Sequence, residues 1–440
     1  MSAHFTLSAS GLGARGADGT LPYVPTSASP GAALRAVSEP VDDATALLEY
    51  ASAAHPLVAL RRGDGIVGIG EVARLSFTGP DRLERAAAAW RELAAAARVD
   101  DAVHEPGSGL VAFGAFAFAD TSAVESVLIV PEIIVGRRGP VSWVTRITTD
   151  DGGRDLELAP PVASRLGARP RATLAAASLS RQEYVELVRD AVARIRSGEV
   201  EKVVMARDAR AGIPADADRR AVLRELAEAY PDTLTFAVDG LVGASPETLV
   251  SVHAREASAR VLAGSRARGA GAIDDAAAAT ALATSTKDLD EHAFAVQSVL
   301  RALRPHARAV TASESPFTLK LANLWHLATD VEVELSEDAS GLDLVAALHP
   351  TAAVAGSPTA DALRLIAELE PFDRGRYAGP VGWIDQDGDG EWVIALRCAR
   401  IDGDGTLTAY AGAGIVADSD PESELAETRM KFRPIADALR

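Results

Sequence analysis

Two acidic pairs stand out because their spacing places two carboxylates on one face of a helix. Glu424 and Glu427 lie in ESELAETRMK, and Lys431 follows four residues later. Asp420 before Pro421 predicts a helix that begins with an N-cap and a proline at its first position. Residues three or four apart in a helix are neighbours, so these two carboxylates and the lysine should share one face.

The second pair, Asp288 and Glu291, has the same spacing in STKDLDEH. Two helices with such faces could hold one divalent cation between them, because Mg²⁺ favours carboxylate oxygens and keeps several waters. On spacing alone the alternative is favoured, namely two solvated helix faces whose ion pairs each contribute about 0.3 kcal/mol. Asp288 could equally close a capping box with Ser285.

Lysine is rare in this chain. Of 44 lysines and arginines, only Lys202, Lys287, Lys320 and Lys431 are lysine. Lysine can lose its proton when it is buried or crowded by cations and then act as a base, whereas arginine stays charged. Each lysine is therefore a candidate for chemistry that arginine cannot do, against the alternative of chance survival.

Composition narrows the class of protein. The chain has 440 residues, 48% of them hydrophobic and 24% charged, which is typical of a globular protein with one large core or two ordinary ones. A net charge of −18 argues against binding to nucleic acid or an anionic membrane, so an anionic ligand would need local cations. No long apolar run or signal-peptide pattern occurs, which predicts a cytoplasmic protein. The single cysteine, Cys398, excludes an internal disulfide and is expected to pack in a strand.

The order of the elements suggests one folded unit after a loose start. Residues 1–38 are rich in Ser, Gly, Ala and Pro and predict a loose lead-in. We expect a single unit over residues 39–440, with an N-terminal half (39–160), a connection (161–178) and a catalytic region (179–440). Within the first half, GLVAFGAFAFAD predicts a buried strand pair.

The elements after the connection place two candidate residues. Ser180 and Glu183 predict a capping box that opens a helix ending near Gly198. Four short β-like runs follow it, with Lys202 at the start of one and Glu247 at the start of another. Residues 274–303 then predict one long helix, and EWVIALRCAR predicts a strand. Helices and strands thus mix without regular βαβ alternation, which predicts an α/β protein of the α+β type with large sheets.

Nine blocks of sequence, in order between about residue 178 and residue 440, closely resemble the chorismate-utilising enzymes and, among these, the isochorismate synthases. The resemblance implies a fold in which two large, mostly antiparallel sheets pack together with helices outside. The blocks are EKVVMAR, GASPETLV, LAGSRARG, STKDLDEHAFAVQ, LWHLATDV, LHPTAAVAGSP, ELEPFDRGRYAGPVGW, EWVIALRCAR and AGAGIVADSDPESELAETRMK.

The resemblance also implies a reaction, in which water adds at ring carbon C2 of chorismate and the hydroxyl at C4 leaves. Lys202 in EKVVMAR matches the general base, which requires a lowered pKa. Glu247 in GASPETLV matches the general acid, which requires a raised pKa. The alternative for Glu247 is a turn glutamate after Ser-Pro.

By the same resemblance, Glu291 and Glu427 match positions that bind Mg²⁺, and the Mg²⁺ in turn binds the ring carboxylate of chorismate. Asp288 and Glu424 would then hold metal-bound waters or orient the site. This gives the two acidic pairs a common purpose that their spacing alone does not establish.

The resemblance implies nine substrate-binding positions. Arg397 and Lys431 would bind carboxylates, Tyr377 would add a hydroxyl, and His326 would lie near the reacting ring, although a histidine in this setting is commonly a core residue. Glycines would let backbone N–H groups approach the substrate. The nine positions are Gly264, Ser265, His326, Ala353, Val354, Tyr377, Arg397, Gly412 and Lys431.

The segment LHPTAAVAG bears on the choice of product. Ala353 followed by Val354 resembles the isochorismate formers, which usually have Ala-Leu, whereas anthranilate and salicylate formers typically have threonine first. We therefore expect an isochorismate synthase of menaquinone or siderophore biosynthesis, acting as a monomer without a glutaminase partner. A salicylate synthase and a non-catalytic chorismate-binding scaffold are the alternatives.

Overall fold

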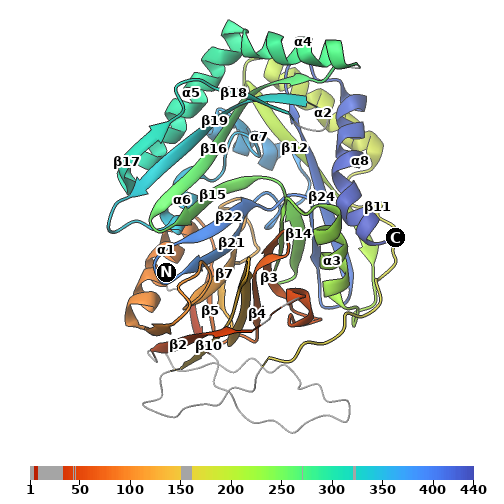
Figure 1. Cartoon of the computed structure of the whole chain (residues 1–440). Helices are drawn as coiled ribbons and strands as arrows, with labels where there is room; N and C mark the ends of the chain where they lie inside the picture. Colours follow the sequence, from red (N-terminus) through yellow and green to blue (C-terminus); the bar gives the residue numbers. More distant parts are fainter. Residues whose placement is uncertain are drawn as a thin grey trace.

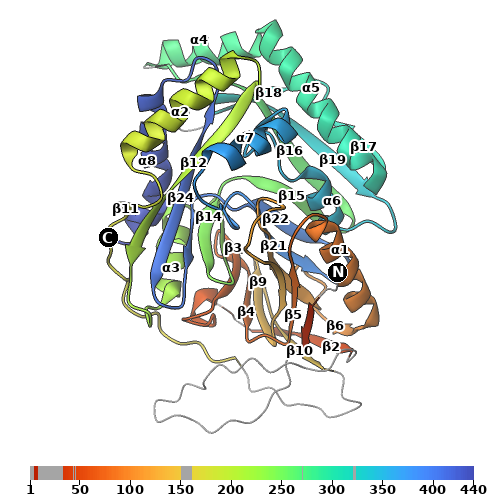
Figure 2. The ribbon, with the colours of Figure 1, turned by 180° about the vertical axis from the view of Figure 1, so that it is seen from behind.

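The structure, a computed structural model, describes residues 4–7, 33–42, 44, 46–149, 161–269, 271–320 and 324–440. Two large sheets with helices on their outer sides make up this part of the chain (Figure 1, and from behind in Figure 2). Every described strand pairing is antiparallel except the parallel pair β2–β6. The predicted α+β class with two mostly antiparallel sheets is confirmed.

The first sheet, called the eleven-strand sheet below, runs from the N-terminal half into the catalytic region. Its last strands, β16 and β19, are long and form the upper left of Figure 1. In order, the described strands are β1 (His4–Leu7), β5 (Ala73–Phe77), β8 (Ser126–Val130), β7 (Val111–Ala115), β21 (Pro380–Asp385), β22 (Gly390–Ile394), β15 (Thr248–His253), β16 (Glu256–Ala267), β19 (Leu324–Leu335) and β17 (Ala307–Ala312), with β18 (Phe317–Lys320) also paired to β19.

The second sheet, called the thirteen-strand sheet, carries β12 and β24 at its upper end. In order, its described strands are β11 (Ala175–Ala176), β12 (Lys202–Gly212), β24 (Thr406–Ile415), β23 (Cys398–Ile401), β14 (Leu241–Ser245), β13 (Leu234–Val238), β3 (Leu57–Arg61), β4 (Asp64–Ile69), β9 (Ile133–Arg138), β10 (Val141–Thr149), β2 (Leu34–Val41) and β6 (Arg98–Asp101), with β20 (Gly356–Ser357) paired to β12. Because β7 pairs with β21 and β3 with β13, neither sheet is built from one half of the chain alone.

Helices cover the two sheets from outside. Helices α4 and α5 pack on β16 and β19, whereas α2, α3 and α8 pack on the thirteen-strand sheet. Helices α1 and α6 pack on each other beside the eleven-strand sheet, and α7 packs on β12 and β20. The described α-helices are α1 (Arg82–Ala96), α2 (Arg181–Arg196), α3 (Arg219–Ala229), α4 (Ala272–Ala283), α5 (Thr286–Leu303), α6 (Gly341–Leu348), α7 (Thr359–Leu369) and α8 (Pro421–Ala438); η1 (Leu47–Glu49) and η2 (Arg304–His306) are 3₁₀ turns. None of the described helices is long and apolar enough to cross a membrane.

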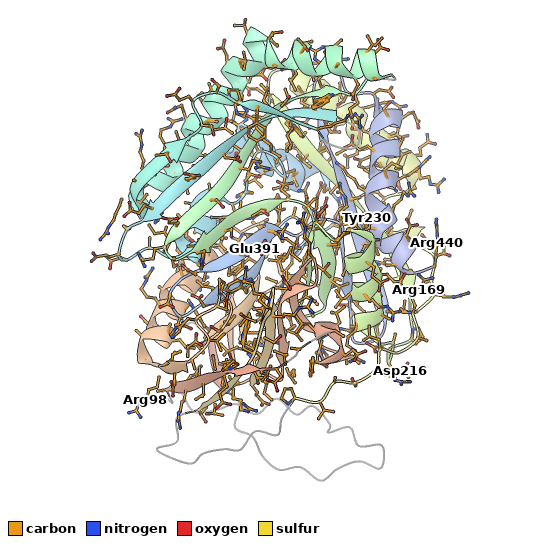
Figure 3. All side chains as sticks on the ribbon, in the orientation of Figure 1. Arg98, Arg169, Asp216, Tyr230, Glu391 and Arg440 are labelled. Atoms are coloured by element: carbon orange, nitrogen blue, oxygen red, sulfur yellow. The ribbon has the colours of Figure 1, made fainter. Side chains whose placement is uncertain are left out.

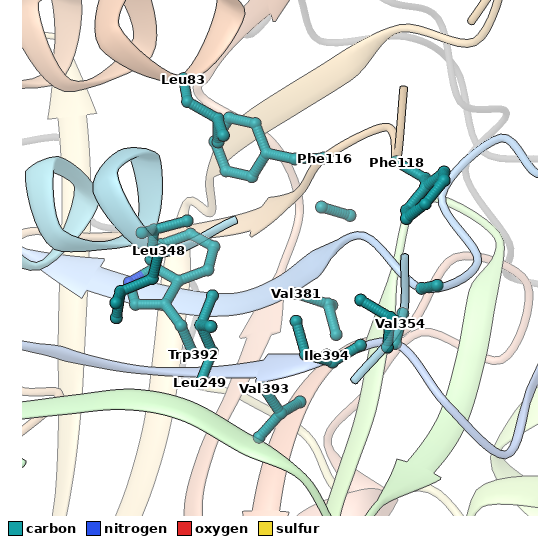
Figure 4. Close-up of a cluster of buried hydrophobic side chains, with 14 of the residues drawn as sticks. Leu83, Phe116, Phe118, Leu249, Leu348, Val354, Val381, Trp392, Val393 and Ile394 are labelled. Carbon is teal, nitrogen blue, oxygen red and sulfur yellow. The ribbon is translucent and has the colours of Figure 1, made fainter. Parts of the chain in front are cut away.

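The thirteen-strand sheet is buried on both faces. One face shares a large apolar cluster with the eleven-strand sheet, which includes Phe116, Val354, Trp392 and Ile394 (Figure 4). The other face packs against α3 and α8, where Ile435 belongs to a second cluster. This explains why β12 and β24 are buried at almost every position instead of at every second one.

Local signals at helix starts predicted the structure well. The capping box of Ser180 and Glu183 is present, and the helix it opens ends at Arg196, close to the predicted Gly198. Asp420 caps α8, and Pro421 is its first residue. Cys398 is buried in β23, as expected.

Three longer predictions were wrong. Residues 274–303 form two helices, because Ser285 accepts a hydrogen bond from the N–H of Asp288 and so begins α5 after a break. Residues 109–120 contain one strand, β7, and not a pair. Residues 391–400 contribute to two strands, β22 and β23, which belong to different sheets.

Two of the predicted boundaries, those of the lead-in and of the connection, fall on residues that the structure describes. Strand β2 begins at Leu34, inside the predicted lead-in 1–38, most of which lies outside the described residues. The connection 161–178 has no helix and runs past the end of α8, where the N–H of Ala172 donates to the carbonyl of Leu439. Arg169 and Arg440 mark this region in Figure 3.

Candidate active site

Two of the segments at which the chain crosses from one sheet to the other, residues 245–248 and 394–398, lie next to each other, and we call them the sheet junction. The first joins β14 to β15 and the second joins β22 to β23. The two are bonded to each other: Ser245 Oγ donates to the carbonyl of Ile394 (2.6 Å), and the N–H of Ile394 donates to the carbonyl of Glu247 (3.0 Å). Two predicted site residues, Glu247 and Arg397, lie in the junction.

Arg397 has a left-handed backbone, with φ of 50°. This is an unfavourable conformation for a residue with a side chain, and such strain is concentrated at functional sites. Its carbonyl accepts a hydrogen bond from the N–H of Ala244, which holds the turn against β14. Arg397 therefore lies at a fixed kink between the sheets and not within the strand that its sequence predicted.

Lys202 begins β12 at the edge of the same region. Its backbone is held by β20, since Lys202 pairs with Ser357, and a Cβ on Gly356 would lie 2.2 Å from the Lys202 carbonyl. On the neighbouring strand, a Cβ on Gly414 would lie 3.1 Å from Lys202 Cε. Glycine at both positions therefore leaves room for the lysine, which a larger residue would displace.

Lys202 and Glu247 both have shifted pKa values. Burial lowers the pKa of Lys202, Lys431 lowers it further, and the carboxylates of Glu247 and Glu427 oppose the shift. Burial raises the pKa of Glu247, and the nearby cations Lys202, Arg397 and Lys431 oppose that shift. Each group thus lies within electrostatic range of the other, and burial favours the neutral form of both.

Lys431 links helix α8 to strand β24. Its Nζ donates to the carbonyl of Gly412 (2.8 Å) and pairs with Glu427 (2.5 Å) one turn before it. A Cβ on Gly412 would lie 3.0 Å from the hydroxyl of Tyr377, which is buried and stacks on Tyr410. The structure thus brings Lys431 of α8 and Tyr377, which precedes β21, together at Gly412 in β24.

His326 and Gly264 face this group from the eleven-strand sheet. Gly264 forms a bulge in β16 with φ of +75°, and its carbonyl lies 3.3 Å from His326 Nδ1. Burial lowers the pKa of His326, its bond to Gly264 opposes this, and Lys202 and Lys431 lower it further. His326 of the eleven-strand sheet therefore lies within electrostatic range of Lys202 and Lys431, which lie at the thirteen-strand sheet. The side chain of Ser265 lies outside the described part of the structure.

Ala353 and Val354 lie in a turn between α6 and β20. Val354 is buried, whereas Ala353 is exposed. The turn is tied to the strand of Lys202, because the N–H of Val204 donates to the carbonyl of Ala355 (2.9 Å). Ala353 is thus on an accessible surface beside β12, as a residue that contacts a ligand must be.

The four predicted metal ligands are brought together only in pairs. Glu424 and Glu427 lie on α8, and burial raises the pKa of Glu424, with the Ser419 hydrogen bond opposing and Glu427 adding to the shift. Asp288 and Glu291 lie on α5, and Asp288 lies near Gly264, whose Cβ would be 3.4 Å from the Asp288 carbonyl. In the described part of the chain, no three acidic, histidine or cysteine side chains gather closely enough to hold a metal.

The donor chemistry of these pairs nevertheless fits a hard cation. All four side chains are carboxylates, the ligand type that a hard divalent cation prefers, and a cation would stabilise the ionised form of Glu424, whose pKa is raised mainly by burial. The shared metal site itself stays a prediction.

A large cavity of about 790 Å³ lies elsewhere, between α1, α6 and α7. Its lining includes Arg82, Phe118, His349, Glu370 and Arg374, and none of the described site side chains predicted above. This cavity is therefore separate from the candidate site, which the shifted pKa values of Lys202 and Glu247 place at the sheet junction.

Sequence reasoning missed several residues that shape the site. Gly356 and Gly414 flank Lys202, and their signal was available in AVAGSP and AGAGI as glycines beside a strand that carries the candidate base. Glu370 and Arg374 lie in the quoted block ELEPFDRGRY, but no pattern in the sequence indicates that they bind β12.

Comparison with known proteins identifies the family of the chain. The profile of the family described as chorismate binding enzyme matches residues 60–440. Isochorismate synthase DhbC of Bacillus subtilis is 41% identical over 270 residues, covering 59% of this chain and 68% of the relative. The salicylate biosynthesis isochorismate synthase of Pseudomonas aeruginosa is 38% identical over 269 residues, covering 60% and 56%. A crystal structure of DhbC from Bacillus anthracis superposes with a TM-score of 0.68 at 34% identity, covering 89% of this chain and 98% of that one. The chain therefore belongs to the chorismate-binding enzyme family.

Proposed function

We propose that the protein is an isochorismate synthase, which adds water at C2 of chorismate and releases the hydroxyl at C4. The observation that carries the proposal is the pair Lys202 and Glu247. A lysine with a lowered pKa and a carboxyl group with a raised pKa lie within electrostatic range of each other at the sheet junction. A general base and a general acid acting near neutral pH need these directions of shift.

The two groups divide the proton transfers. Neutral Lys202 Nζ accepts a proton from the water that attacks C2, and protonated Glu247 donates a proton to the hydroxyl that leaves C4, while the double bonds shift between the two carbons. The net charge of the enzyme is unchanged, since one group gains the proton that the other loses. The neutral starting forms are those that burial favours.

The cations around the pair suit a dianionic substrate. Arg397 can bind a carboxylate with two parallel hydrogen bonds, and Lys431 supplies a second positive charge beside the backbone of Gly412. His326 is held neutral by burial, which leaves it a hydrogen-bonding group near the ring and not a third cation. Gly264 and Gly412 give the substrate access to the backbone.

Mg²⁺ is part of the proposal. Glu291 and Glu427 would hold it, with Asp288 and Glu424 on its bound waters, and the ion would supply positive charge for the ring carboxylate of chorismate. A role in menaquinone or siderophore biosynthesis is compatible with this product. Cytoplasmic location and action as a monomer stay predictions.

The choice of isochorismate over other products rests on Ala353. An exposed alanine beside β12 has no hydroxyl with which to position ammonia, so we expect water to be the nucleophile. Loss of pyruvate from isochorismate, which gives salicylate, is the second candidate. The relative named for salicylate biosynthesis, which is 38% identical, is itself named an isochorismate synthase, so its name supports the first candidate.

The test is to incubate the purified protein with chorismate and Mg²⁺, with and without ammonium, and to separate the products by chromatography. We expect isochorismate to accumulate beside chorismate, with little pyruvate and no anthranilate. Equimolar salicylate and pyruvate as chief products would establish the second candidate. Anthranilate formed on adding ammonium, or no conversion of chorismate, would overturn the proposal.

A further inference from the structure

Arg374 is a buried arginine that bonds to three separate parts of the structure. It follows α7 and is 3% exposed. Its guanidinium donates to the carbonyl of Val354 (3.0 Å), to the carbonyl of Val204 in β12 (2.6 Å) and to both carboxylate oxygens of Glu370 (2.6 and 2.8 Å). One side chain thus ties the turn that carries Ala353 to the strand that begins at Lys202.

Glu370 completes the connection. Glu370 is 8% exposed. Its Oε1, one of the two oxygens that bind Arg374, also accepts a hydrogen bond from the N–H of Ala206 in β12 (2.7 Å). The charged pair therefore binds the backbone of β12 at two places, the carbonyl of Val204 and the N–H of Ala206. These residues lie two and four positions after Lys202. Each partner satisfies the other, as a buried charge requires.

Aromatic rings fix the orientation of the arginine. Its guanidinium carbon lies 4.5 Å from the ring centre of Phe118 and 6.0 Å from that of Tyr377. Phe118 and Val354 belong to the same buried cluster (Figure 4). Tyr377 in turn lies against Gly412, whose carbonyl accepts a hydrogen bond from Lys431. Through Tyr377 the arginine is therefore connected to the strand that binds Lys431.

We infer, on the basis of the proposed function, that Arg374 and Glu370 are positioning residues that hold the Ala353–Val354 turn against β12 and so favour water addition over pyruvate elimination. Neither residue lines the site through its own reactive atoms. They act through the backbone of Val354, which carries the position on which the choice of product rests, and through β12, which carries the base.

The chemistry of the contact explains why arginine is needed. A planar guanidinium can bond to two carbonyls and a carboxylate at once, whereas a lysine ammonium is a point charge on a flexible chain. The cavity of about 790 Å³ adjoins both Glu370 and Arg374. A shorter or less planar group would therefore let water reach the backbone of β12 and loosen the turn.

The test compares Arg374→Lys with a matched control, Arg220→Lys. Arg220 is also buried (4% exposed) and also bonds to a neighbouring carboxylate, Asp218, and to backbone carbonyls, including that of Ala51. It lies at the start of α3, away from β12 and the turn. Both substitutions remove a buried guanidinium, so a general loss of stability affects both.

The measurement is the ratio of the initial rates at which salicylate and isochorismate form from chorismate. Both rates scale with the amount of folded enzyme, so their ratio does not depend on it. We expect Arg374→Lys to raise the ratio at least ~5-fold and to lower kcat more than it changes KM, because a small misplacement of catalytic groups has large kinetic effects. Arg220→Lys should leave the ratio unchanged. Glu370→Gln keeps the shape of the side chain but removes its charge. It should raise the ratio at least ~2-fold by weakening the hydrogen bonds to Arg374.

The outcomes separate the inference from the proposed function. A wild-type protein that does not convert chorismate contradicts the proposed function and with it this inference. A wild type that makes isochorismate, together with an unchanged product ratio in Glu370→Gln and in any folded Arg374→Lys, overturns the positioning role alone. An equal rise in Arg220→Lys would do the same, since the effect would then be a general one.

Discussion

At the scale of single residues, the site depends on two groups that burial makes neutral. Lys202 and Glu247 would form an ion pair in water, but burial disfavours both charges at once, and the neutral pair has the same net charge as the ionic one. Such a pair titrates as a unit, so its pH dependence belongs to both groups together. Lysine is required at position 202 because arginine does not become neutral.

The first prediction concerns this lysine. Lys202→Arg keeps the positive charge but removes the base, so it should lower kcat at least ~10²-fold while chorismate still binds. Lys320→Arg is the control, because Lys320 pairs with Asp275 on the surface and should tolerate the change. Steady-state kinetics and a chorismate-binding titration make the comparison. An arginine variant with wild-type kcat would reduce Lys202 to a binding group.

At the scale of elements, the starts of helices could be predicted from the sequence, whereas the points where the chain crosses from one sheet to the other could not. Asp420 and Ser180 start helices through bonds to residues within three positions, so the local sequence contains the whole signal. The left-handed turn at Arg397 depends on which sheet each flanking strand joins, and no short pattern encodes that choice. For the same reason a strand was predicted across Arg397 where two strands of different sheets meet.

The second prediction concerns α5 and α8, whose carboxylates we propose to share Mg²⁺. EDTA should abolish turnover, and Glu291→Gln and Glu427→Gln should each raise the Mg²⁺ concentration for half-maximal activity at least ~10-fold, because each removes a charged ligand. Glu422→Gln, an exposed glutamate in the first turn of α8, is the control. Full activity in EDTA would rule out the metal, and an effect of Glu427→Gln alone would exclude α5 from the site.

At the scale of the whole molecule, both sheets combine strands from the two halves of the chain, and the site forms where they meet. Hydrophobic patterns predicted several strands of the catalytic region, but they do not state which strands pair. The gathering of Lys202, Glu247, His326 and Lys431 was therefore predictable only through the resemblance to a known family. The link from Arg374 to β12 was not predicted at all, because it joins residues 170 positions apart.

The third prediction concerns the stability of this assembly in acid. His349 ends α6, and its Nε2 bonds to the carbonyl of Phe118. Burial lowers its pKa from 6.5 to about 3, the Phe118 bond opposes this, and Arg82 adds to it. The unfolded chain thus binds a proton at a higher pH than the folded one, so the contribution of His349 to the unfolding free energy should fall by about 1.4 kcal/mol per pH unit as the pH drops from about 6 to about 4.

Denaturant titrations at several pH values test this contribution. His349→Gln should lower the slope of the unfolding free energy against pH by about 1.4 kcal/mol per pH unit, since it removes the titrating group. His104→Gln, a substitution at an exposed histidine, should leave the slope as in the wild type. Equal slopes for the wild type and His349→Gln would show that His349 does not contribute.

The central claim is that water from solvent enters at C2 as the C4 hydroxyl leaves, and isotope labelling tests it most directly. The protein is given chorismate and Mg²⁺ in H₂¹⁸O, and the isochorismate formed early in the reaction is analysed by mass spectrometry. We expect one ¹⁸O atom in each isochorismate, located in the C2 hydroxyl, and no label in the remaining chorismate at early times. Isochorismate without the label would contradict the proposed roles of Lys202 and Glu247, because the hydroxyl would then have moved within the substrate.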